Sequence, residues 1–227
     1  MKNLVVTLLL LFMFTVGASE QFNFMKNVNS NLTKSEMLKI QNSVEKHMSA
    51  IYEYLDDSQN SQIIYMQIAT ESTFVKTARS NDIGGLNRGL MQVQKDTYYY
   101  LVKKGIIKDE WGRITEIDYN IKIGMIILKM KFDAVKRFNP KNTREHLFMA
   151  LIAYNKGEGK LRDDIMIDNR RDFYNFKYIK TIMGKNRFLK TKYAYKLSKE
   201  RYVYEEFVSR ISDVDYDIVC VGGASQI

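Results

Sequence analysis

The apolar residues of this chain recur mainly with the period of an α-helix. Over residues 33–55 they step by three and four positions, behind Thr33 and Glu36 at capping-box spacing. This pattern predicts one amphipathic helix. Residues 61–70 are apolar around most of a helical circumference, which favours a short helix with little exposed surface that ends at Glu71.

The second half of the chain repeats the helical signal. The apolar positions of residues 120–138 follow a four-three-four-three pattern, and Asn139-Pro140 stops the element. Asn142 and Glu145 have the spacing of a second capping box, before a helix over 146–154 that Gly157 and Gly159 are expected to end.

Between these segments, residues 80–89 are rich in Gly, Asn and Ser and predict a loop, and residues 90–102 predict a further helix. Strand-like alternation is nearly absent, and residues 214–221 form the one β-leaning run. The pattern therefore predicts a mainly α-helical protein.

The first 18 residues have the features of an export signal. A lysine at position 2 precedes an unbroken apolar run from Leu4 to Val16, and Val16 and Ala18 have the spacing of a signal-peptidase site. The run is shorter than the roughly 20 residues that a membrane-spanning helix needs. We expect residues 1–18 to be removed, no transmembrane anchor after processing, and a protein exported to the periplasm or the cell-wall space.

Composition excludes several classes of protein. An apolar share of 45% and a charged share of 27% are typical of a globular protein rather than a collagen-like or disordered one. The single cysteine, Cys220, rules out a disulfide scaffold and receives no catalytic role. His47 and His146 are too few and too far apart to suggest a metal site, so we expect neither a metal nor another cofactor.

The net charge of +9 is concentrated in one segment. Between Arg170 and Arg201, eleven basic residues stand against two acidic ones, interleaved with tyrosines. A solvated helix face is the default interpretation of such a run. The functional alternative is attraction to an anionic wall polymer, stem-peptide carboxylates, a membrane surface or a protein partner, whereas nucleic acid is not expected for an exported protein.

Glu71 is the candidate catalytic residue. Burial and the negative end of the helix dipole both disfavour an ionised carboxylate at the C-terminal end of an apolar helix, so its pKa should rise. A raised carboxyl pKa suits a general acid, and glycosidic bonds are the usual targets of such acids. The alternative is that Glu71 merely ends a helix in water.

A set of motifs adds to this candidate. In chain order they are Glu71-Ser72-x-Phe74, Ala78-x-Ser80, Gly89-Leu90-Met91-Gln92 with Thr97, Asn120-Ile121 with Gly124, Ala153-Tyr154-Asn155-x-Gly157-x-Gly159, and Tyr202-Val203. Their order and spacing resemble the soluble lytic transglycosylase family over about residues 60–208. The resemblance implies a mainly α, lysozyme-like (goose-type) helical domain acting on peptidoglycan glycan strands.

By this resemblance, Glu71 protonates the oxygen of the bond between N-acetylmuramic acid and N-acetylglucosamine, and then takes a proton from the muramoyl C6 hydroxyl to form a 1,6-anhydro sugar. Assistance by the 2-acetamido group requires only one carboxylate. Asp82, the nearest second candidate, is more easily explained as a loop-capping residue than as a nucleophile.

The resemblance also implies the substrate-binding residues. Ser72 would bond close to the acid, Ser80 and Gln92 would bind sugar hydroxyls and amides, and Met91 would line the groove. Tyr154 would stack on a sugar, Asn155 would bind an acetamido or peptide carbonyl, and Tyr202 would reach back to Glu71.

The expected organisation is a signal peptide (1–18), an N-terminal helical segment packed on the core (19–60), a catalytic domain (61–210) containing the basic segment 170–201, and a C-terminal tail (211–227), in a monomer. Two alternatives remain at this point. One is a hydrolase of the same fold, and the other is a non-catalytic wall-binding scaffold that uses the basic segment.

Overall fold

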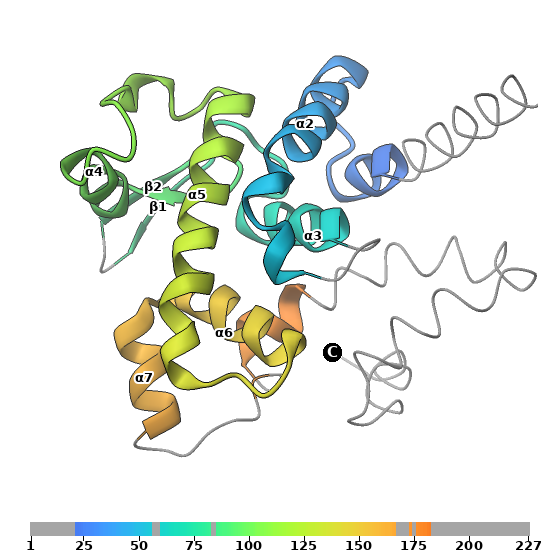
Figure 1. Ribbon diagram of the computed structural model, residues 1–227. Coiled ribbons are helices and arrows are strands. Elements are labelled where there is room, and N and C mark those ends of the chain that lie inside the picture. Colours follow the sequence, from blue (N-terminus) through green and yellow to red (C-terminus); the bar gives the residue numbers. More distant parts are fainter. Residues whose placement is uncertain (1–20, 56–59, 83–84, 167–172, 174–175, 183–227) are drawn as a thin grey trace, which may run out of the picture. The chain divides into compact units, whose positions relative to one another are not determined.

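The computed structural model describes residues 21–55, 60–82, 85–166, 173 and 176–182. The predicted signal peptide, the C-terminal tail, Tyr202 and most of the basic segment lie outside these residues. The described part is mainly helical (Figure 1), with a small sheet.

Within the described residues, the helices, 3₁₀ turns and strands have the following bounds. The helices are α2 (Lys34–His47), α3 (Asn60–Ser72), α4 (Lys95–Lys103), α5 (Ile117–Val135), α6 (Thr143–Lys156) and α7 (Glu158–Met166); the 3₁₀ turns are η1 (Met48–Ala50), η2 (Tyr52–Tyr54), η3 (Trp111–Arg113) and η4 (Lys136–Phe138); the strands are β1 (Arg79–Asp82), β2 (Gly85–Arg88) and β3 (Val93–Gln94). Residues 21–28 and 177–182 are also helical.

Helix α5 is the central element. It packs against α2, α6, α7 and β3, and Figure 1 shows α4 and the β1–β2 hairpin on one side of it and α2 and α3 on the other. Ten of its residues are buried, among them Ile121, Leu128 and Phe132. The helix predicted over 120–138 is confirmed, with its last turn tightened into η4 and closed by Asn139 in the left-handed conformation (φ 51°).

The helix predicted over 33–55 is confirmed only in its first part. The Thr33–Glu36 capping box forms and starts α2, but α2 ends at His47, and η1 and η2 follow. Met37, Ile40, Val44, Met48 and Ile51 are all buried as the pattern indicated. The apolar spacing thus identified the buried face correctly, although not the change of helical geometry along it.

Helix α3 matches its prediction closely. Its residues from Ile63 to Ala69 are all buried, so almost no face of the helix meets solvent before its last turn. Glu71 lies in that turn, one residue before the helix ends.

The prediction of a loop over residues 80–89 is wrong. Strands β1, β2 and β3 form an antiparallel sheet in that order, with Ser80 opposite Asn87 and Asn87 opposite Gln94. Both faces of the hairpin are largely polar, so it lacks the apolar alternation that would reveal it in sequence. Because Val93 and Gln94 join this sheet, the next helix begins at Lys95 rather than at residue 90.

The two glycines after the Ala-Tyr-Asn motif have different roles. Asn142 caps α6 by accepting from the Glu145 amide (2.9 Å), and Gly157 ends that helix with a φ of 82°. Gly159 was expected to help end the same helix, but it lies inside α7.

Two apolar clusters form the core. The larger joins residues 21–28, α2, α3, α5, α6, α7 and the helix at 177–182, and the smaller lies beneath α4 and one face of α5. Tyr154 packs against both. Of the basic segment, the described lysines Lys177 and Lys180 are exposed while Tyr178, Ile179 and Ile182 are buried, so this part of it is an amphipathic helix with a solvated basic face.

No helix in the described ranges combines the length and the apolar character needed to cross a membrane.

Candidate active site

A cleft of about 870 Å³ opens where the two apolar clusters meet. The end of α3, the hairpin, α5 and the end of α6 each contribute to its lining. Six of the predicted catalytic and substrate-binding residues line it, namely Glu71, Ser72, Ser80, Gln92, Tyr154 and Asn155. Segments far apart in the chain are therefore brought together at one site.

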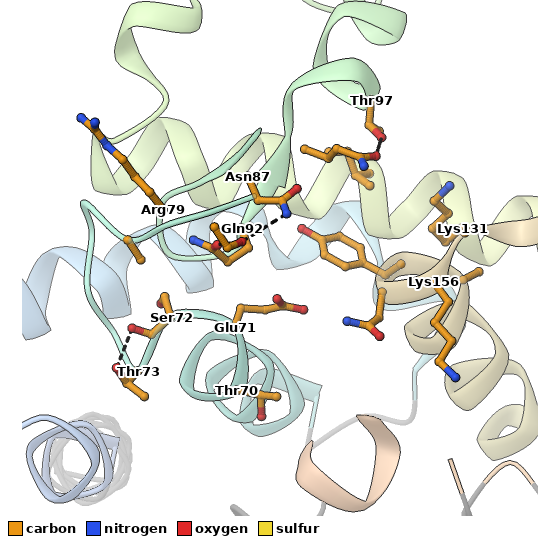
Figure 2. Close-up of a pocket in the computed structure, with 18 residues that line it drawn as sticks. Thr70, Glu71, Ser72, Thr73, Arg79, Asn87, Gln92, Thr97, Lys131 and Lys156 are labelled. Carbon is orange, nitrogen blue, oxygen red and sulfur yellow. Dashed lines mark hydrogen bonds between the residues drawn. The ribbon is translucent and has the colours of Figure 1, made fainter. Parts of the chain in front are cut away.

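The end of α3 presents Glu71 to the cleft. The chain leaves the helix through two consecutive residues with left-handed backbones, Thr73 (φ 49°) and Phe74 (φ 61°). Phe74 is buried and packs edge-on against Phe24, with ring centroids 5.9 Å apart. This anchored turn holds the last turn of the helix in place, and Figure 2 shows Glu71 reaching into the cleft beneath Gln92 and Asn87. Its side chain is half-buried.

The hydroxyl of Tyr178 donates a hydrogen bond to Oε1 of Glu71. A donor on a carboxyl oxygen favours the ionised form of the acid, in opposition to burial. In a protonated carboxyl group the carbonyl-type oxygen is the better acceptor, so the bond from Tyr178 to Oε1 favours Oε2 as the atom that carries the proton.

Two buried tyrosine hydroxyls flank the acid. The pKa values of Tyr178 and Tyr154 are both raised well above the ordinary value, first by burial and then by the charge of Glu71. Both side chains are therefore neutral hydrogen-bond donors throughout the range in which proteins are stable. Tyr154 is anchored by donating to the Met91 carbonyl oxygen (2.8 Å).

The turn that carries Gln92 is built on glycine and on Asn120. Gly89 has a φ of 82°, and a Cβ there would lie 2.2 Å from Nδ2 of Asn120. The Asn120 amide is wholly buried; it accepts from the Met91 N–H (2.8 Å) and donates to the Arg88 and Ile114 carbonyls (3.0 and 2.8 Å). The motif residues Gly89 and Asn120 thus fix the turn.

A row of polar side chains crosses the sheet at the cleft. The strand register aligns Ser80, Asn87 and Gln94, and all three line the cleft. Asn87 donates to the Ser80 hydroxyl oxygen (3.2 Å), Ser80 donates to Oε1 of Gln92 (2.7 Å), and Gln92 donates to the Gly89 carbonyl (2.8 Å). This row offers amides and hydroxyls suited to binding a sugar or an N-acetyl group.

Two expected contacts differ in the structure. Met91 was expected to line the groove, but its side chain is fully buried and packs on Gly124, where a Cβ would lie 2.3 Å from its sulfur. Ser72 lines the cleft, yet its hydroxyl bonds the Ile68 carbonyl (3.1 Å), as serines near helix ends commonly do. Met91 instead contributes its backbone carbonyl, which Tyr154 binds.

The cleft is richer in cations than in anions. Glu71 is the one carboxyl side chain among its described lining residues, whereas Arg79, Lys131 and Lys156 contribute positive charge. Figure 2 shows Lys131 and Lys156 together on the opposite side of Glu71 from Arg79. Lys131 is mostly buried and pairs with Glu158 (3.1 Å).

The second carboxylate candidate and the two histidines have structural contacts. Asp82 pairs through its backbone with Gly85 in the hairpin. His47 contacts Asp118, and His146 contacts the Phe132 carbonyl, both outside the cleft. Among the described residues no group of His, Cys, Asp and Glu side chains is arranged to hold a metal ion.

Tyr178 is the functional residue that sequence reasoning missed. It bonds Glu71, as the resemblance implied for Tyr202, which lies outside the described residues. A signal for it was present, because Tyr178 is followed by β-branched Ile179, as Tyr202 is by Val203. Asn87, which lines the cleft, was not among the predicted substrate-binding residues, since a polar residue in a polar stretch gives no sign that it will be buried.

Comparison with known proteins identifies the domain that contains the cleft. The family model described as the transglycosylase SLT domain matches residues 48–177, more than half of the chain. The match includes the whole described lining of the cleft, and the mainly helical architecture fits the lysozyme-like fold expected for it. The search of curated proteins gave no match.

Proposed function

Because the chain belongs to the transglycosylase SLT domain family, whose general function is transglycosylase-type action on peptidoglycan, we propose that it is a lytic transglycosylase with Glu71 as its acid and base. The observation that carries this proposal is the position of Glu71 as the lone carboxyl among the described residues of a cleft that Gln92 and Asn155 share. A glycosidase that uses two carboxylates would need a second one across the bond.

In the first step, Glu71 gives the proton on Oε2 to the oxygen between N-acetylmuramic acid and N-acetylglucosamine. The bond from the muramoyl C1 to that oxygen breaks, and the 2-acetamido oxygen stabilises the positive charge at C1. The Tyr178 hydroxyl, already directed at Oε1, stabilises the carboxylate that forms.

In the second step, the muramoyl C6 hydroxyl oxygen attacks C1 and its proton passes to Glu71. The ring closes as a 1,6-anhydro sugar, the acid is regenerated, and no water is consumed. We infer that Ser80, Asn87, Gln94, Gln92 and Asn155 bind the sugar hydroxyls and acetamido groups during both steps; their common place in the lining of the cleft supports this inference.

We propose that the substrate is reached after export. The apolar run within residues 1–18 supports removal of that segment and release into the periplasm or cell-wall space. N-terminal sequencing of the protein recovered from that compartment is expected to begin at Ser19; retention of residues 1–18 contradicts this part of the proposal.

Digestion of purified sacculi tests the reaction. The wild-type protein is expected to release fragments ending in 1,6-anhydro-N-acetylmuramic acid, each lighter by one water than a hydrolysis product, as mass spectrometry can measure. The Glu71→Gln variant keeps the shape of the side chain but cannot donate the proton, so the rate should fall roughly a thousandfold. Its thermal unfolding, followed by circular dichroism, is the control for folding.

Each of the other outcomes selects a different function. Fragments with only reducing ends identify a hydrolase of the same fold. Binding to sacculi without any cleavage by the wild type identifies a scaffold, and full activity of Glu71→Gln contradicts the assignment of the acid.

A further inference from the structure

A buried amide without regular hydrogen bonds lies beside the acid. Gln67 stands one helical turn before Glu71 on α3 and is wholly buried. Neither Oε1 nor Nε2 of Gln67 has a hydrogen-bond partner within the described part of the chain. Buried amides in proteins are nearly always bonded, so an unbonded one in the middle of an apolar helix calls for a reason.

The neighbour of Gln67 is the hydroxyl of Tyr178. The Gln67 amide lowers the pKa of Tyr178, as a hydrogen-bond donor to the phenol oxygen does. Burial and the charge of Glu71 raise the pKa of Tyr178 by more. No bond of regular geometry joins the two side chains. A phenol oxygen can accept one hydrogen bond while its proton is donated elsewhere, so an N–H of Gln67 donated to that oxygen would complete a chain from Gln67 through Tyr178 to Glu71.

We propose that Gln67 is a positioning residue for the reaction, acting through Tyr178 by donating its amide N–H to the phenol oxygen and thereby directing the phenol proton to Oε1 of Glu71. The inference rests on the proposed function of Glu71 as acid and base. Gln67 does not line the cleft and so does not touch substrate itself.

The direction of the effect follows from the chain of donors. An amide that donates to the phenol oxygen makes the phenol a stronger donor to the carboxylate. This stabilises ionised Glu71, so loss of the amide lets Glu71 hold its proton to higher pH. The groups that face Tyr178 and can change this balance are Glu71 of α3 and Tyr154 of α6; Lys131 and Lys156 line the same cleft.

Gln67→Met, which keeps the length and removes the donor, tests the proposal. We expect kcat/KM on sacculi to fall roughly threefold to tenfold, the effect of one hydrogen bond. The fall in activity at alkaline pH, which reports loss of the acid's proton, should move to higher pH by about half a unit. The matched control Ile64→Met changes another wholly buried residue of α3 and should leave the pH profile unmoved.

A double variant decides whether Gln67 acts through Tyr178. In a Tyr178→Phe background, Gln67→Met should produce no further shift of the profile. An equal shift in both backgrounds, or no shift in either, overturns the proposal. If Gln67→Met does not fold, Gln67→Asn, which retains the amide but shortens its reach, should show the same direction of shift.

Titration of the Glu71 carboxyl carbon by NMR tests the same inference without an assay of wall cleavage. The midpoint is expected to be higher in Gln67→Met than in the wild type, and equal midpoints overturn the proposal. If the wild type cleaves nothing but the Glu71 midpoint is still higher in Gln67→Met than in the wild type, only the proposed function is contradicted.

Discussion

The two walls of the cleft are built on different physical grounds. The helical wall, formed by α3, α5 and α6, is held by apolar burial, and it supplies the acid and Tyr154. The hairpin wall is held by strand pairing, one glycine turn and the buried amide of Asn120, and it supplies the polar row. Burial on one wall and directed hydrogen bonds on the other together fix the Glu71 carboxyl opposite a row of polar side chains.

The contrast predicts different responses to substitution. Changes within the helical scaffold should reduce stability before they affect activity, unless they touch the acid or its partners. Changes in the hairpin wall should affect activity through the position of Gln92. In the turn at Gly89, a substitution should reduce both stability and activity.

The largest combined effect is expected for Gly89→Ala. The new Cβ would stand 2.2 Å from the Asn120 amide on a backbone with a φ of 82°. We expect the free energy of unfolding, measured in urea, to fall by about 2–4 kcal/mol. Activity on sacculi should fall roughly a hundredfold, because displacement of Gln92 disturbs substrate positioning.

Gly105→Ala is the matched control for Gly89→Ala. Gly105 also has a positive φ (69°), but a Cβ there would meet nothing within 4 Å. It should cost only about 1 kcal/mol of backbone strain and leave activity intact. Equal effects of the two substitutions would show that contact with Asn120 does not hold the hairpin wall.

Next in size is Tyr178→Phe, which removes the donor to Oε1 of Glu71 while keeping the ring. The activity should fall roughly tenfold, and the alkaline fall in kcat/KM should move to higher pH, because the lost bond favoured the ionised acid. The exposed Tyr100→Phe serves as control. An unchanged pH profile in Tyr178→Phe would contradict the role given to the hydroxyl.

On the helical side, Glu36→Gln should change stability with little effect on catalysis. Hydrogen bonds from Lys76 and from Thr33 lower the pKa of Glu36 from 4.5 to about 2. Since the folded-state pKa is the lower one, the stabilisation is present above about pH 4.5 and is lost as the pH falls towards 2. Over that interval, we expect the free energy of unfolding of the wild type to fall by about 1 kcal/mol more than that of Glu36→Gln, allowing for solvent screening.

Urea denaturation at several pH values between 2 and 7 measures this difference. Lys76→Met removes the ammonium group whose Nζ lies 2.9 Å from Oε1 of Glu36, and it should reproduce much of the Glu36→Gln result. Parallel acid profiles for the wild type and both variants would show that this ion pair does not support the helical scaffold.

The smallest effect is expected for Ser80→Ala in the hairpin wall. The substitution removes the hydroxyl that donates to Gln92 Oε1 (2.7 Å) and accepts from Asn87. Activity should fall about threefold, while the free energy of unfolding should change by less than about 0.5 kcal/mol because Ser80 is exposed. If Ser80→Ala lost stability but kept its activity, the expectation that the hairpin wall affects activity more than stability would be contradicted.

The same distinction explains what the sequence could predict. The apolar pattern located α3 and α5, and capping-box spacing located the cap residues Thr33 and Asn142 that begin α2 and α6. Each of these signals lies within a few neighbouring residues. The motif residues Glu71, Ser80, Gln92, Tyr154 and Asn155 all line the cleft, while the roles that the resemblance implies for them stay predictions. Burial of one face and local capping are therefore enough to place most of the helical wall.

What escaped prediction depends on partners distant in the chain. The hairpin is stabilised by strand pairing between polar segments, which has no hydrophobic period. Met91 is drawn into the core by the missing side chain of Gly124, and Tyr178 reaches Glu71 across 107 positions of sequence. None of these contacts is encoded in the spacing of neighbouring residues.

Cleavage of sacculi in water labelled with heavy oxygen is the most direct test, because Glu71 is proposed to recover a proton from the muramoyl C6 hydroxyl rather than from an attacking water. Mass spectrometry of the released muramoyl ends is expected to show 1,6-anhydro termini with no heavy oxygen incorporated. Reducing termini that carry heavy oxygen from the earliest time points would contradict the account, because water rather than the C6 hydroxyl would then have attacked C1.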